Sequence, residues 1–529
     1  MKLTWDTTDH YCNYPEIIKK EYRKNYIKYF NKFAYWIDNI AKENGSNLSW
    51  WLSTVASRDE RESNLYHNIC IYFTILKNKN LNLQSVVINS NALKKILIRD
   101  LKEVFIIKVK KNFLEKKKLI FKNFIFYLIQ FLIIKIISVK KKIEKKTCLI
   151  GTYVINKKNY NFYGNFFSKN KKNIIFCPIF TNSSLKFFFL YILKRYKKNN
   201  YLFKESYLSF KDLFYSFFLK GKINLNINKI FFDKKIDFNS IIFEEINSNR
   251  YLRSVLQGHL NYFFFKKIRQ KNLIFSKIIN SFENQIPDKG WNLGINTYYP
   301  SIKNIGHQSV LYHPQFQNLY PTNSEYSFKV IPKKIFLTGQ FFIKERIKFC
   351  KKINFLLTKD FKFDKIRKVK KNIQILVLFS GIKVHDQQLL SLILKNYNFF
   401  KEKKIIVYLK FHPILESRFF LKDMKNLSFI KEIKGKGSII IQRSKIVITS
   451  SFTAGIYESL IRNCYTLLYH MHPFDYKIHK NFNYLNNFIF FDNSKNMLNI
   501  LNIILNKKNH LKETNNLRIN NFKSLLFSK

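Results

Sequence analysis

The sequence predicts a two-domain α/β protein, and three observations lead to that fold class. From residue 147 onward, short apolar runs bounded by polar turns alternate with helical patterns, which is typical of mostly parallel sheets. The chain has 529 residues, more than one ordinary core holds, so two domains are expected. Its hydrophobic share of 46% is ample for two cores and excludes a disordered chain.

The elements of the first half begin with a helix. Apolar and aromatic residues recur at helical spacing over 14–42 and end near Gly45. Residues 83–91 predict a buried strand that ends in a polar loop. The alternating series then has strands at 147–155, 173–180 and 241–246, and it continues through 273–286 and 300–310.

Residues 104–146 stand apart as a lysine-rich helical insertion in the N-terminal half. Its apolar stretch 119–138 approaches the length that spans a bilayer. However, Lys122 and Lys135 lie inside that stretch, and each would be costly near the middle of a spanning helix. We therefore expect a helix that lies in the membrane interface or packs as a hairpin arm, with a buried core helix as the alternative.

A linker is expected near 321–345, because this segment contains Pro321, Pro332 and Gly339. A second alternating series follows, with a strand over 372–381, a helix near 386–398, a strand over 403–413, a strand–loop–helix–strand unit over 444–473 and a strand over 488–493. We divide the chain into an N-terminal domain over 1–330, a C-terminal domain over 331–510 and a tail over 511–529.

Lysine dominates the formal net charge of +60 and is spread over nearly every segment. Nucleic-acid-binding proteins usually concentrate arginine in one patch or stripe. The abundance of Lys, Asn, Ile, Phe and Tyr instead matches AT-rich codons, so genome composition explains much of the bias. Attraction to an anionic membrane or substrate ranks second and nucleic-acid binding third. We therefore expect an anionic membrane surface as a partner and no specific nucleic acid.

The six cysteines lie far apart and have neither the close spacing of a zinc site nor the density of a disulfide framework. Reduced thiols in a cytoplasmic protein are the expectation that follows. The first residues contain no apolar segment of the kind found in signal peptides, so no secretory signal is expected.

The segment 446–460 carries the most specific local pattern. A buried strand leads Ser450 and Ser451 into a turn, and Thr453 lies where the next helix opens. Ligands of doubly wound sheets bind at the carboxyl ends of strands, and a helix N-terminus with small hydroxyl side chains suits a phosphate. Glu458 falls on the first turns of that helix, where it could accept hydrogen bonds from ribose hydroxyls. The alternative for this segment alone is a Ser/Thr helix cap with a supporting Glu.

A second pattern ends at His412 and Pro413, directly after an apolar strand. A histidine in that place can donate a hydrogen bond to a phosphate oxygen, and it can stabilise or protonate a departing phosphate. A loop histidine without such a role is the alternative for this segment alone.

Together, the His412–Pro413 pair and the serine turn some forty residues later resemble the donor-nucleotide half of several GT-B glycosyltransferase families. These include bacterial sialyltransferases, capsule Kdo transferases and CDP-glycerol-type polymerases, and the resemblance covers roughly 370–475. It implies a GT-B-like fold with two Rossmann-like domains that face a cleft. It also implies that His412, Ser450 and Ser451 contact the donor phosphate and that Glu458 lies near the ribose.

Two phrases of the first half look like those of a bacterial family of surface carbohydrate biosynthesis proteins, which is linked to O-antigen-type polysaccharide. They are Phe-Glu-Asn-Gln at 282–285 and Ile-Gly-His-Gln at 305–308, together with the early segment 50–68. Glu283 follows an apolar run and precedes a turn, so it is a candidate general base or binding carboxylate at the cleft, with a helix-end Glu as the alternative.

Several further polar residues are candidates for the cleft. His307 and Gln308 end a strand-like segment, where many GT-B proteins place polar residues that face the donor. Arg58 and Arg61 could contact an anionic donor or acceptor, although as surface arginines they need no such role. The pair 244–245 is a weaker candidate for the base, because an isoleucine follows it where the sialyltransferase pattern has glycine.

These features predict a glycosyltransferase that moves a sugar from a nucleotide-sugar donor to a surface polysaccharide or lipid-linked saccharide. Glu283 would take the acceptor proton, while His412 and the serine turn stabilise the leaving phosphate. No metal and no cofactor beyond the nucleotide-sugar co-substrate are expected, because no DxD motif follows a strand and no Walker loop or GxGxxG fingerprint occurs. The expected location is the cytoplasm, peripherally on the inner face of the cytoplasmic membrane.

Three alternatives stay open from the sequence. The protein could transfer another group, such as glycerol phosphate, on the same fold. It could instead be a non-catalytic GT-B-like protein that binds glycan or assembles a polysaccharide complex. The third alternative is a nucleic-acid-binding protein, whose affinity would fall steeply with salt.

Overall fold

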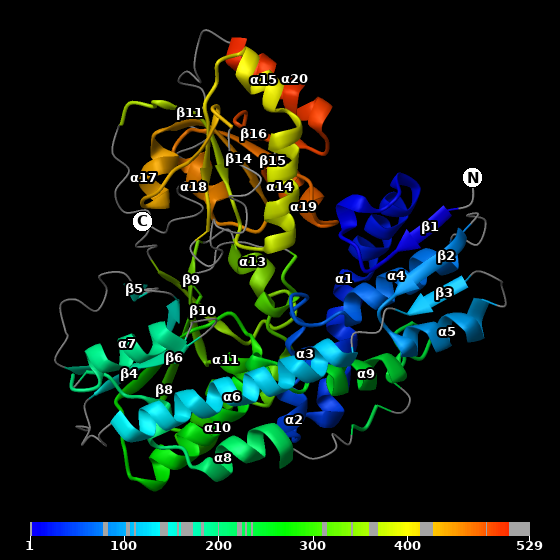
Figure 1. Ribbon diagram of the computed structural model, residues 1–529. Helices are drawn as coiled ribbons and strands as arrows, with labels where there is room; N and C mark the ends of the chain where they lie inside the picture. Colours follow the sequence, from blue (N-terminus) through cyan, green and yellow to red (C-terminus); the bar gives the residue numbers. More distant parts are fainter. Residues whose placement is uncertain are drawn as a thin grey trace.

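The protein consists of three mostly parallel β-sheets with flanking helices, as a computed structural model shows (Figure 1). One sheet belongs to the N-terminal residues, one to the middle of the chain and one to the C-terminal part. The structure describes residues 3–77, 83–101, 106–109, 113–137, 147–155, 158–159, 173–180, 185–198, 200–219, 225–227, 230–233, 236–308, 315–339, 342–358, 369–412, 427–482 and 484–506. The expected tail over 511–529 lies outside these residues.

The C-terminal sheet is doubly wound, as the second alternating series predicted. Its strands are β11 (Ile373–Leu378), β12 (Val407–Lys410), β13 (Ile430–Glu432), β14 (Ser444–Ser450), β15 (Tyr465–Tyr469) and β16 (Phe488–Phe491). All six are parallel, in the order β13-β12-β11-β14-β15-β16, which is the strand order of Rossmann sheets. The order reverses between β11 and β14, and ligands of such sheets bind there, outside the carboxyl ends of the strands.

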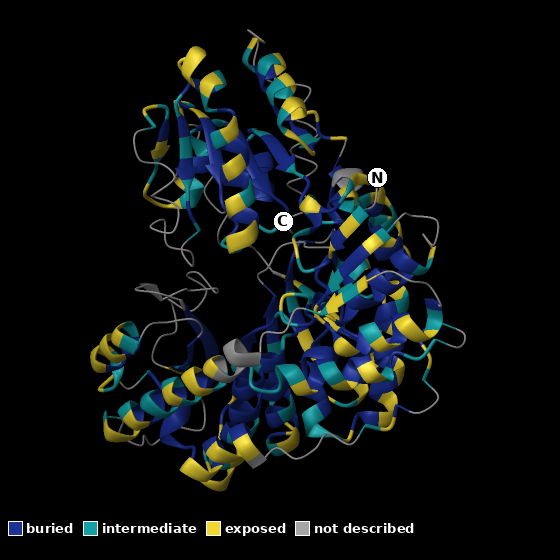
Figure 2. Cartoon of the chain, turned by 45° about the vertical axis from the view of Figure 1, so that its right-hand side comes forward, coloured by how far each residue is buried: buried dark blue, intermediate teal, exposed yellow. Residues whose placement is uncertain are grey.

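Helices cover both faces of this sheet. They are α14 (Lys383–Lys395), α15 (Tyr397–Glu402), α17 (Gly437–Gln442), α18 (Gly455–Ile461), α19 (Asp475–Phe482) and α20 (Ser494–Asn506). Ile375 and Val377 of β11 belong to the core formed with α14 and α20, whereas Leu376 packs with α17 on the opposite face. Successive strand residues point to opposite faces, so a sheet covered on both sides needs continuous apolar strands, and these are buried in Figure 2.

The middle sheet is also parallel apart from one short hairpin strand. It contains β4 (Cys148–Ile155), β5 (Lys158–Asn159), β6 (Ile174–Phe180), β7 (Lys277–Ser281), β8 (Lys303–Gln308), β9 (Lys334–Thr338) and β10 (Asn354–Thr358). The parallel strands follow the order β6-β4-β7-β8-β9-β10, and β5 pairs antiparallel with β4. The two predicted Rossmann-like sheets are therefore confirmed.

The boundary between these two sheets lies later than the sequence suggested. We expected a linker near 321–345 and a boundary at 330–331, but β9 and β10 pair onto β8 and so belong to the middle sheet. The expected linker also contains the short helices α12 (Asn323–Ser327) and α13 (Ile343–Arg346), and η5 (Gln317–Leu319) precedes them. Pro321 lies between η5 and α12, and Pro332 precedes β9, so neither proline separates the two sheets.

Helices α10 (Arg253–Gln270) and α11 (Ile286–Tyr298) pack closely against each other beside the middle sheet (Figure 1). Glycine permits this crossing, because a Cβ added to Gly290 would lie 2.0 Å from the carbonyl oxygen of Gly258. The remaining helical elements of this region are α6 (Phe113–Ile137), α7 (Leu185–Arg195), η3 (Lys204–Ser206), α8 (Phe210–Phe214) and the π-helix η4 (Tyr215–Leu219).

The expected insertion over 104–146 is in part a strand and in part a packed helix. Residues 106–109 form a strand of the N-terminal sheet, and residues 138–146 lie outside the described residues. Helix α6 packs one side on the protein, because Tyr127 and Phe131 are buried in the core beside the middle sheet. Phe121 and Ile136 of the same helix are 66% and 82% exposed. The helix is therefore a docked element with an open apolar side.

An additional N-terminal unit, which the sequence did not predict, precedes and flanks the middle sheet. It has its own parallel sheet of β1 (Leu3–Asp6), β2 (Leu83–Ile88) and β3 (Ile106–Val109), in that order. Its helical elements are η1 (Tyr11–Asn13), α1 (Glu16–Asn44), α2 (Leu48–Trp51), α3 (Thr54–Ser57), α4 (Leu65–Lys77), α5 (Asn91–Leu101) and α9 (Asn239–Asn249). Below, "N-terminal unit" means this sheet with these helices.

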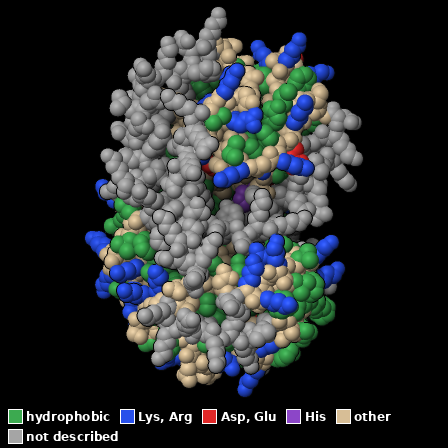
Figure 3. Space-filling model, turned by 90° about the vertical axis from the view of Figure 1, so that its left-hand side faces the viewer, with side chains coloured by type: hydrophobic (Ala, Val, Ile, Leu, Met, Phe, Trp, Pro, Cys, Tyr) green, Lys and Arg blue, Asp and Glu red, His purple; other side chains and the backbone are tan. Residues whose placement is uncertain are grey.

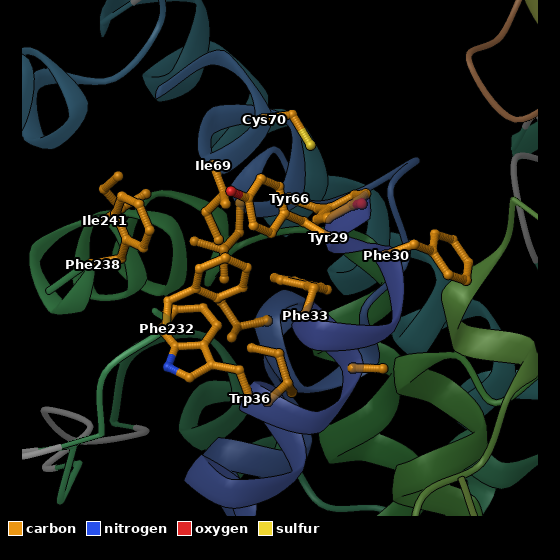
Figure 4. Close-up of a cluster of buried hydrophobic side chains, with 14 of the residues drawn as sticks. Tyr29, Phe30, Phe33, Trp36, Tyr66, Ile69, Cys70, Phe232, Phe238 and Ile241 are labelled. Atoms are coloured by element: carbon orange, nitrogen blue, oxygen red, sulfur yellow. The ribbon is translucent and has the colours of Figure 1, made fainter. Parts of the chain in front are cut away.

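Aromatic side chains fill the core of the N-terminal unit (Figure 4). Tyr29 of α1 stacks on Phe73 of α4 with ring centroids 4.1 Å apart, and Trp36 meets Phe232 edge-on at 5.2 Å. Such pairs each add about 0.5–1.5 kcal/mol beyond the burial of their area. The predicted helix over 14–42 thus becomes the central element of a packed aromatic core.

The strand expected at 241–246 is wrong, because these residues lie in α9. Ile241, Ile242 and Ile246 are buried together in the aromatic core, at the spacing of one helix face. Glu244 caps α5, since its carboxylate accepts hydrogen bonds from the N–H groups of Asn91 and Ala92 at 3.0 and 2.9 Å. The weak base candidates at 244–245 therefore have structural partners.

A buried ionic network joins the N-terminal unit to the middle sheet. Arg58 Nη2 lies 2.9 Å from both carboxylate oxygens of Glu325, and their side chains are 1% and 2% exposed. Lys289 of α11 donates to the same carboxylate, and Asn284 does so at 3.1 Å. Burial opposes ionisation of Glu325, but the two neighbouring cations outweigh it and lower its pKa.

Replacing Glu325 with glutamine should destabilise the protein strongly. The change leaves two buried cations without their counter-charge, and breaking a buried pair in this way costs about 3–5 kcal/mol. The measurement is the free energy of unfolding in urea. Glu16→Gln is the matched control, because that carboxylate forms an exposed pair with Lys19 and should change stability by less than ~1 kcal/mol. Equal effects of the two substitutions would contradict the role of the network.

Candidate functional site

A cavity of about 360 Å³ opens between the N-terminal unit and the carboxyl edge of the C-terminal sheet. Small-molecule sites commonly have volumes of about 300–1,000 Å³. The C-terminal wall consists of Ile382 and His385 after β11, Phe452 after β14 and His472 after β15. The opposite wall comes from the loop after β1, tyrosines of α1 and α4, and the segment that contains Glu60, Arg61, Ser63 and Asn64. The cavity thus lies where the strand order of the C-terminal sheet reverses, as expected of a ligand site in this fold.

Gly381 brings the loop after β11 against His412, which follows β12. The φ of Gly381 is +88°, and a Cβ at this residue would lie 2.6 Å from His412 Nδ1. Burial, with a contribution from Lys410, lowers the pKa of His412 to about 4. The imidazole is therefore neutral near pH 7, so it can donate or accept a hydrogen bond but brings no positive charge. Pro413 lies outside the described residues.

The serine turn lies at the carboxyl end of β14, where the sequence predicted it. The Ser450 side chain is 1% exposed, and its Oγ has no hydrogen-bond partner in the part of the chain that the structure describes. An unsatisfied buried hydroxyl costs about 1–3 kcal/mol. Ser450 is therefore suited to a ligand group that reaches the end of β14, and the neighbouring Ser451 is buried as well.

Thr453 and Glu458 have partners within their own helix. Thr453 Oγ1 accepts a hydrogen bond from the N–H of Gly455 at 3.1 Å. Glu458 forms an ion pair with Arg462, one turn further along α18, at 3.2 Å. The N-cap residue of α18 is Ala454, which makes no side-chain cap hydrogen bond, so these contacts are not those of a Ser/Thr cap with a supporting Glu.

Glu283 lies at the carboxyl end of β7, next to the buried ionic network. Its Oε2 accepts a hydrogen bond from Gln285 Nε2 at 3.0 Å, and its backbone N–H donates to Asp288 Oδ2 at 2.9 Å. Burial raises the pKa of Asp288 to about 7, and the charge of Glu283 adds to that rise. The negative charge of Glu283 also acts on Arg61, a residue of the cavity wall. The structure thus brings Glu283 close to the cavity but not into its lining.

His307 and Gln308 end β8, beside Glu283 at the same edge of the middle sheet. Both are buried, and Gln308 Oε1 has no hydrogen-bond partner among the described residues. Neither residue lines the 360 Å³ cavity. They mark a polar carboxyl edge of the middle sheet instead.

Arg58 does not face the cavity, and this corrects the sequence-based expectation. Its guanidinium is buried against Glu325 and donates to the carbonyl of Tyr320 at 3.1 Å. Arg61 lines the cavity instead and forms two hydrogen bonds with Asp59, at 2.8 and 2.7 Å. The Arg61 guanidinium also lies 4.5 Å from the centre of the Phe316 ring. The sequence could not separate the two arginines, because their local contexts are alike and only burial distinguishes them.

The sequence-based reasoning missed the carboxylate at the centre of the cavity wall, Glu60. Its Oε2 accepts a hydrogen bond from the Tyr26 hydroxyl and lies 3.3 Å from His472 Nε2. His10 of the loop after β1 lies on the same wall, with its ring centroid 4.6 Å from that of His385. A charged run at 58–62 and a histidine directly after a strand were the only local signals. Their pairing joins segments about 400 residues apart, so no spacing in the sequence reveals it.

Among the described residues, no three His, Cys, Asp or Glu side chains are grouped so that they could hold a metal ion. The polar groups of the site are hydroxyls, imidazoles, carboxylates and one guanidinium.

Comparison with known proteins gives structural similarity without sequence similarity. No family model matches the chain, and no curated protein sequence matches it. Among solved structures it is similar to the calicheamicin glycosyltransferase CalG4, with 7% identity, a TM-score of 0.41 and coverage of 73% of this chain and 95% of that one. MurG of Acinetobacter baumannii gives 8% identity, a TM-score of 0.35 and coverage of 68% and 90%. SnogD from Streptomyces nogalater gives 7% identity, a TM-score of 0.39 and coverage of 72% of this chain and 96% of that one. Values this low do not decide what this chain does.

His412→Asn should make the stability of the protein less dependent on pH between about pH 4 and pH 6.5. Between pH 6.5 and about 4 the unfolded histidine binds a proton that the folded one does not, so wild-type stability falls as the pH falls through this window. Removing this group should reduce the slope of the free energy of unfolding against pH by up to about 1.4 kcal/mol per pH unit. Some slope should persist, because His10 and His385 also have lowered pKa values.

The measurement is the free energy of unfolding in urea at several pH values. In the control Lys410→Gln, loss of the neighbouring cation should raise the pKa of His412 and give a smaller reduction in slope. An unchanged slope in His412→Asn would show that the ring is not held neutral by the fold.

Proposed function

We propose that the protein is a GT-B-like glycosyltransferase that uses a nucleotide-sugar donor. The observation that carries this proposal is the carboxyl edge of the C-terminal sheet, where a Rossmann strand order, a buried hydroxyl without a partner and a neutral histidine meet beside a ligand-sized cavity. The similarity of the His412 and serine-turn segments to donor-binding segments of GT-B families points in the same direction.

The donor phosphate would lie at the ends of β12 and β14. His412 would donate an N–H to it from the end of β12, and the hydroxyls of Ser450 and Ser451 would donate from the end of β14, on the other side of β11. Preorganised donors of this kind stabilise charge that develops on a leaving phosphate oxygen. Thr453 would support the turn, and Glu458 would lie near the ribose only if its pairing with Arg462 opens.

The reaction would be displacement at the anomeric carbon of the donor sugar. The bond from that carbon to the phosphate oxygen breaks, and a bond to the acceptor oxygen forms. Glu283 is the base that we propose for the acceptor proton, because it follows β7 within electrostatic reach of Arg61, a residue of the cavity wall. His307 and Gln308 would line the acceptor side of the cleft. The acceptor that we propose is a surface polysaccharide of the O-antigen type or its lipid-linked precursor.

A nucleotide panel tests the donor site. We expect one class among CMP, UDP, GDP, dTDP and CDP, free or sugar-linked, to raise the melting temperature of the wild type. Ser450→Ala should leave the melting temperature of the free protein unchanged or higher, because it removes an unsatisfied buried hydroxyl, yet reduce the shift with nucleotide. His412→Asn should also reduce that shift.

Ser459→Ala is the matched control, because this buried serine has partners in Ile456 and Thr466 and should lose stability without losing nucleotide binding. If no nucleotide stabilises the wild type, the transferase proposal fails and a glycan-binding or assembly role takes its place. Turnover of CDP-glycerol instead of a nucleotide-sugar would indicate the glycerol-phosphate reaction.

We also propose that the enzyme works peripherally on an anionic membrane, through one surface of the middle region. Helix α6 is the only helix in the described ranges that is long and apolar enough to cross a membrane, with mean hydropathy 1.9 over Ile120–Ile137 and 28% of that stretch buried. Its neighbours α7, α8 and η4 expose large apolar side chains as well. The exposed apolar residues of these elements, together called the apolar surface, are Phe121, Ile125, Leu132, Ile136, Phe189, Leu190, Leu193, Phe210, Phe214, Tyr215 and Phe218.

Lysines accompany the apolar surface, and this pairing supports a lipid partner. Lys118, Lys122, Lys186 and Lys211 are all exposed on the same helices. Figure 3 shows Lys and Arg side chains interspersed with hydrophobic ones over the lower half of one face. Aromatic groups that enter the headgroup region, with cations beside anionic lipids, are the features of interfacial helices.

The triple substitution Phe121→Ser, Leu190→Ser, Phe218→Ser should weaken binding to vesicles that contain phosphatidylglycerol by roughly tenfold or more, because each side chain loses apolar burial. Cosedimentation measures this. The control Ile98→Ser, Ile503→Ser changes equally exposed apolar residues elsewhere and should bind as the wild type does. Raised salt should weaken wild-type binding as well. Equal binding to vesicles of phosphatidylcholine alone would contradict the role of the lysines.

A further inference from the structure

The N-terminal wall of the cavity carries a carboxylate whose two oxygens have different surroundings. Glu60 Oε2 accepts from the Tyr26 hydroxyl and faces His472 Nε2 at 3.3 Å. Glu60 Oε1 is buried from solvent and has no hydrogen-bond partner among the described residues. A carboxylate oxygen has two lone pairs, and leaving them unmatched in a buried place is costly. One side of this group is therefore held by the protein and the other is left for a ligand.

The orientation of Glu60 is fixed by its partners. His472 Nδ1 accepts the N–H of Phe474 at 3.2 Å, so the ring proton lies on Nε2 and points at Glu60. Burial disfavours the charged form of His472, but the Glu60 carboxylate outweighs it and raises the pKa of that histidine. Burial also raises the pKa of Tyr26, which therefore stays a hydroxyl donor. Both donors keep pointing at Oε2 whether or not His472 carries a charge.

Apart from Asp9 and Arg61, the rest of the wall is mostly polar but uncharged, or aromatic. Burial lowers the pKa of His10 to about 4 and lowers that of His385 as well, so both rings are uncharged near neutral pH. Tyr11, Tyr14 and Phe452 add ring surfaces to the lining. Arg61, the one permanent cation of the wall, already donates two hydrogen bonds to the Asp59 carboxylate. Such a wall is suited to a neutral ligand with hydroxyl groups and apolar C–H faces, and poorly suited to a phosphate.

We propose that this cavity is a subsite for a neutral sugar residue, and that Glu60 Oε1 accepts a hydrogen bond from one of its hydroxyl groups. The assignment of the sugar as a substrate rests on the proposed function, whereas the binding itself does not. The aromatic rings cover the C–H face of the sugar, and the imidazoles of His10 and His385 meet further hydroxyls. The subsite spans two units of the fold, because Glu60 comes from the N-terminal unit and Phe452 from the C-terminal sheet.

Binding of methyl glycosides to the full chain tests this subsite. The probes are the methyl glycosides of glucose, galactose, mannose, rhamnose and N-acetylglucosamine, measured by saturation-transfer NMR and by titration. At least one should bind the wild type, and Glu60→Gln should weaken it about tenfold, the effect expected of losing a hydrogen bond to a charged group. Glu62→Gln is the matched control, because this carboxylate is two residues away, partly buried, and outside the cavity lining.

Two further readouts separate the possible failures. Phe452→Ala changes the opposite wall without touching Glu60, so it should also weaken glycoside binding even if Glu60→Gln does not fold. Nucleotide binding at the ends of β12 and β14 should stay within twofold of the wild type in Glu60→Gln. If nucleotide binds but no glycoside does, or if neither substitution changes glycoside binding, the subsite is refuted while the transferase proposal stands. If glycosides bind as expected and no nucleotide does, the subsite stands and the proposed function fails.

Discussion

The buried carboxylate of Glu325 holds together the segments that build the cleft. It is bound by Arg58 from the N-terminal unit, by Lys289 from α11 and by Asn284 from the loop after β7. Moving such ions out of water costs several kcal/mol each, so the network is stable only because its geometry satisfies nearly every charge. Arg58 is two residues from Glu60, and Asn284 follows Glu283. The network therefore sets the positions of both carboxylates that face or approach the cavity.

The cavity exists because the N-terminal unit lies over the carboxyl edge of the C-terminal sheet. Phe30 of α1 stacks on Phe474 with ring centroids 4.4 Å apart, and the Cys12 thiol contacts the carbonyl of Met471 at 3.7 Å. These contacts follow directly after β15, so the unit closes over the point where the strand order reverses. A doubly wound sheet alone offers an open edge, and here a second unit turns that edge into an enclosed site.

Charge is distributed very differently inside and outside this protein. The formal net charge is +60, yet the cavity wall contains neutral imidazoles and a single arginine that is paired with an aspartate. Desolvation is the cause. Burial disfavours the charged form of an imidazole, so its pKa falls and the ring is neutral near pH 7. Apart from the buried Lys204 and Lys289, the lysines of the described residues lie wholly or partly at the surface, and on α6 and α7 they accompany exposed apolar side chains. The overall charge thus bears on which partners the surface attracts, whereas the charge state of the cavity residues depends on their local burial.

The sequence by itself determined the α/β class, most strands of both large sheets and the places of His412 and the serine turn at strand ends. It could do so because buried parallel strands need continuous apolar runs, and ligand sites of such sheets follow their carboxyl ends. It failed at 241–246, where a short apolar run does not distinguish a strand from one face of a helix. Only the tertiary structure decided that Arg58 is buried while Arg61 faces the cavity, and that Glu60 meets His472. Those facts depend on contacts between segments hundreds of residues apart in the sequence, and no local pattern encodes which segments come together.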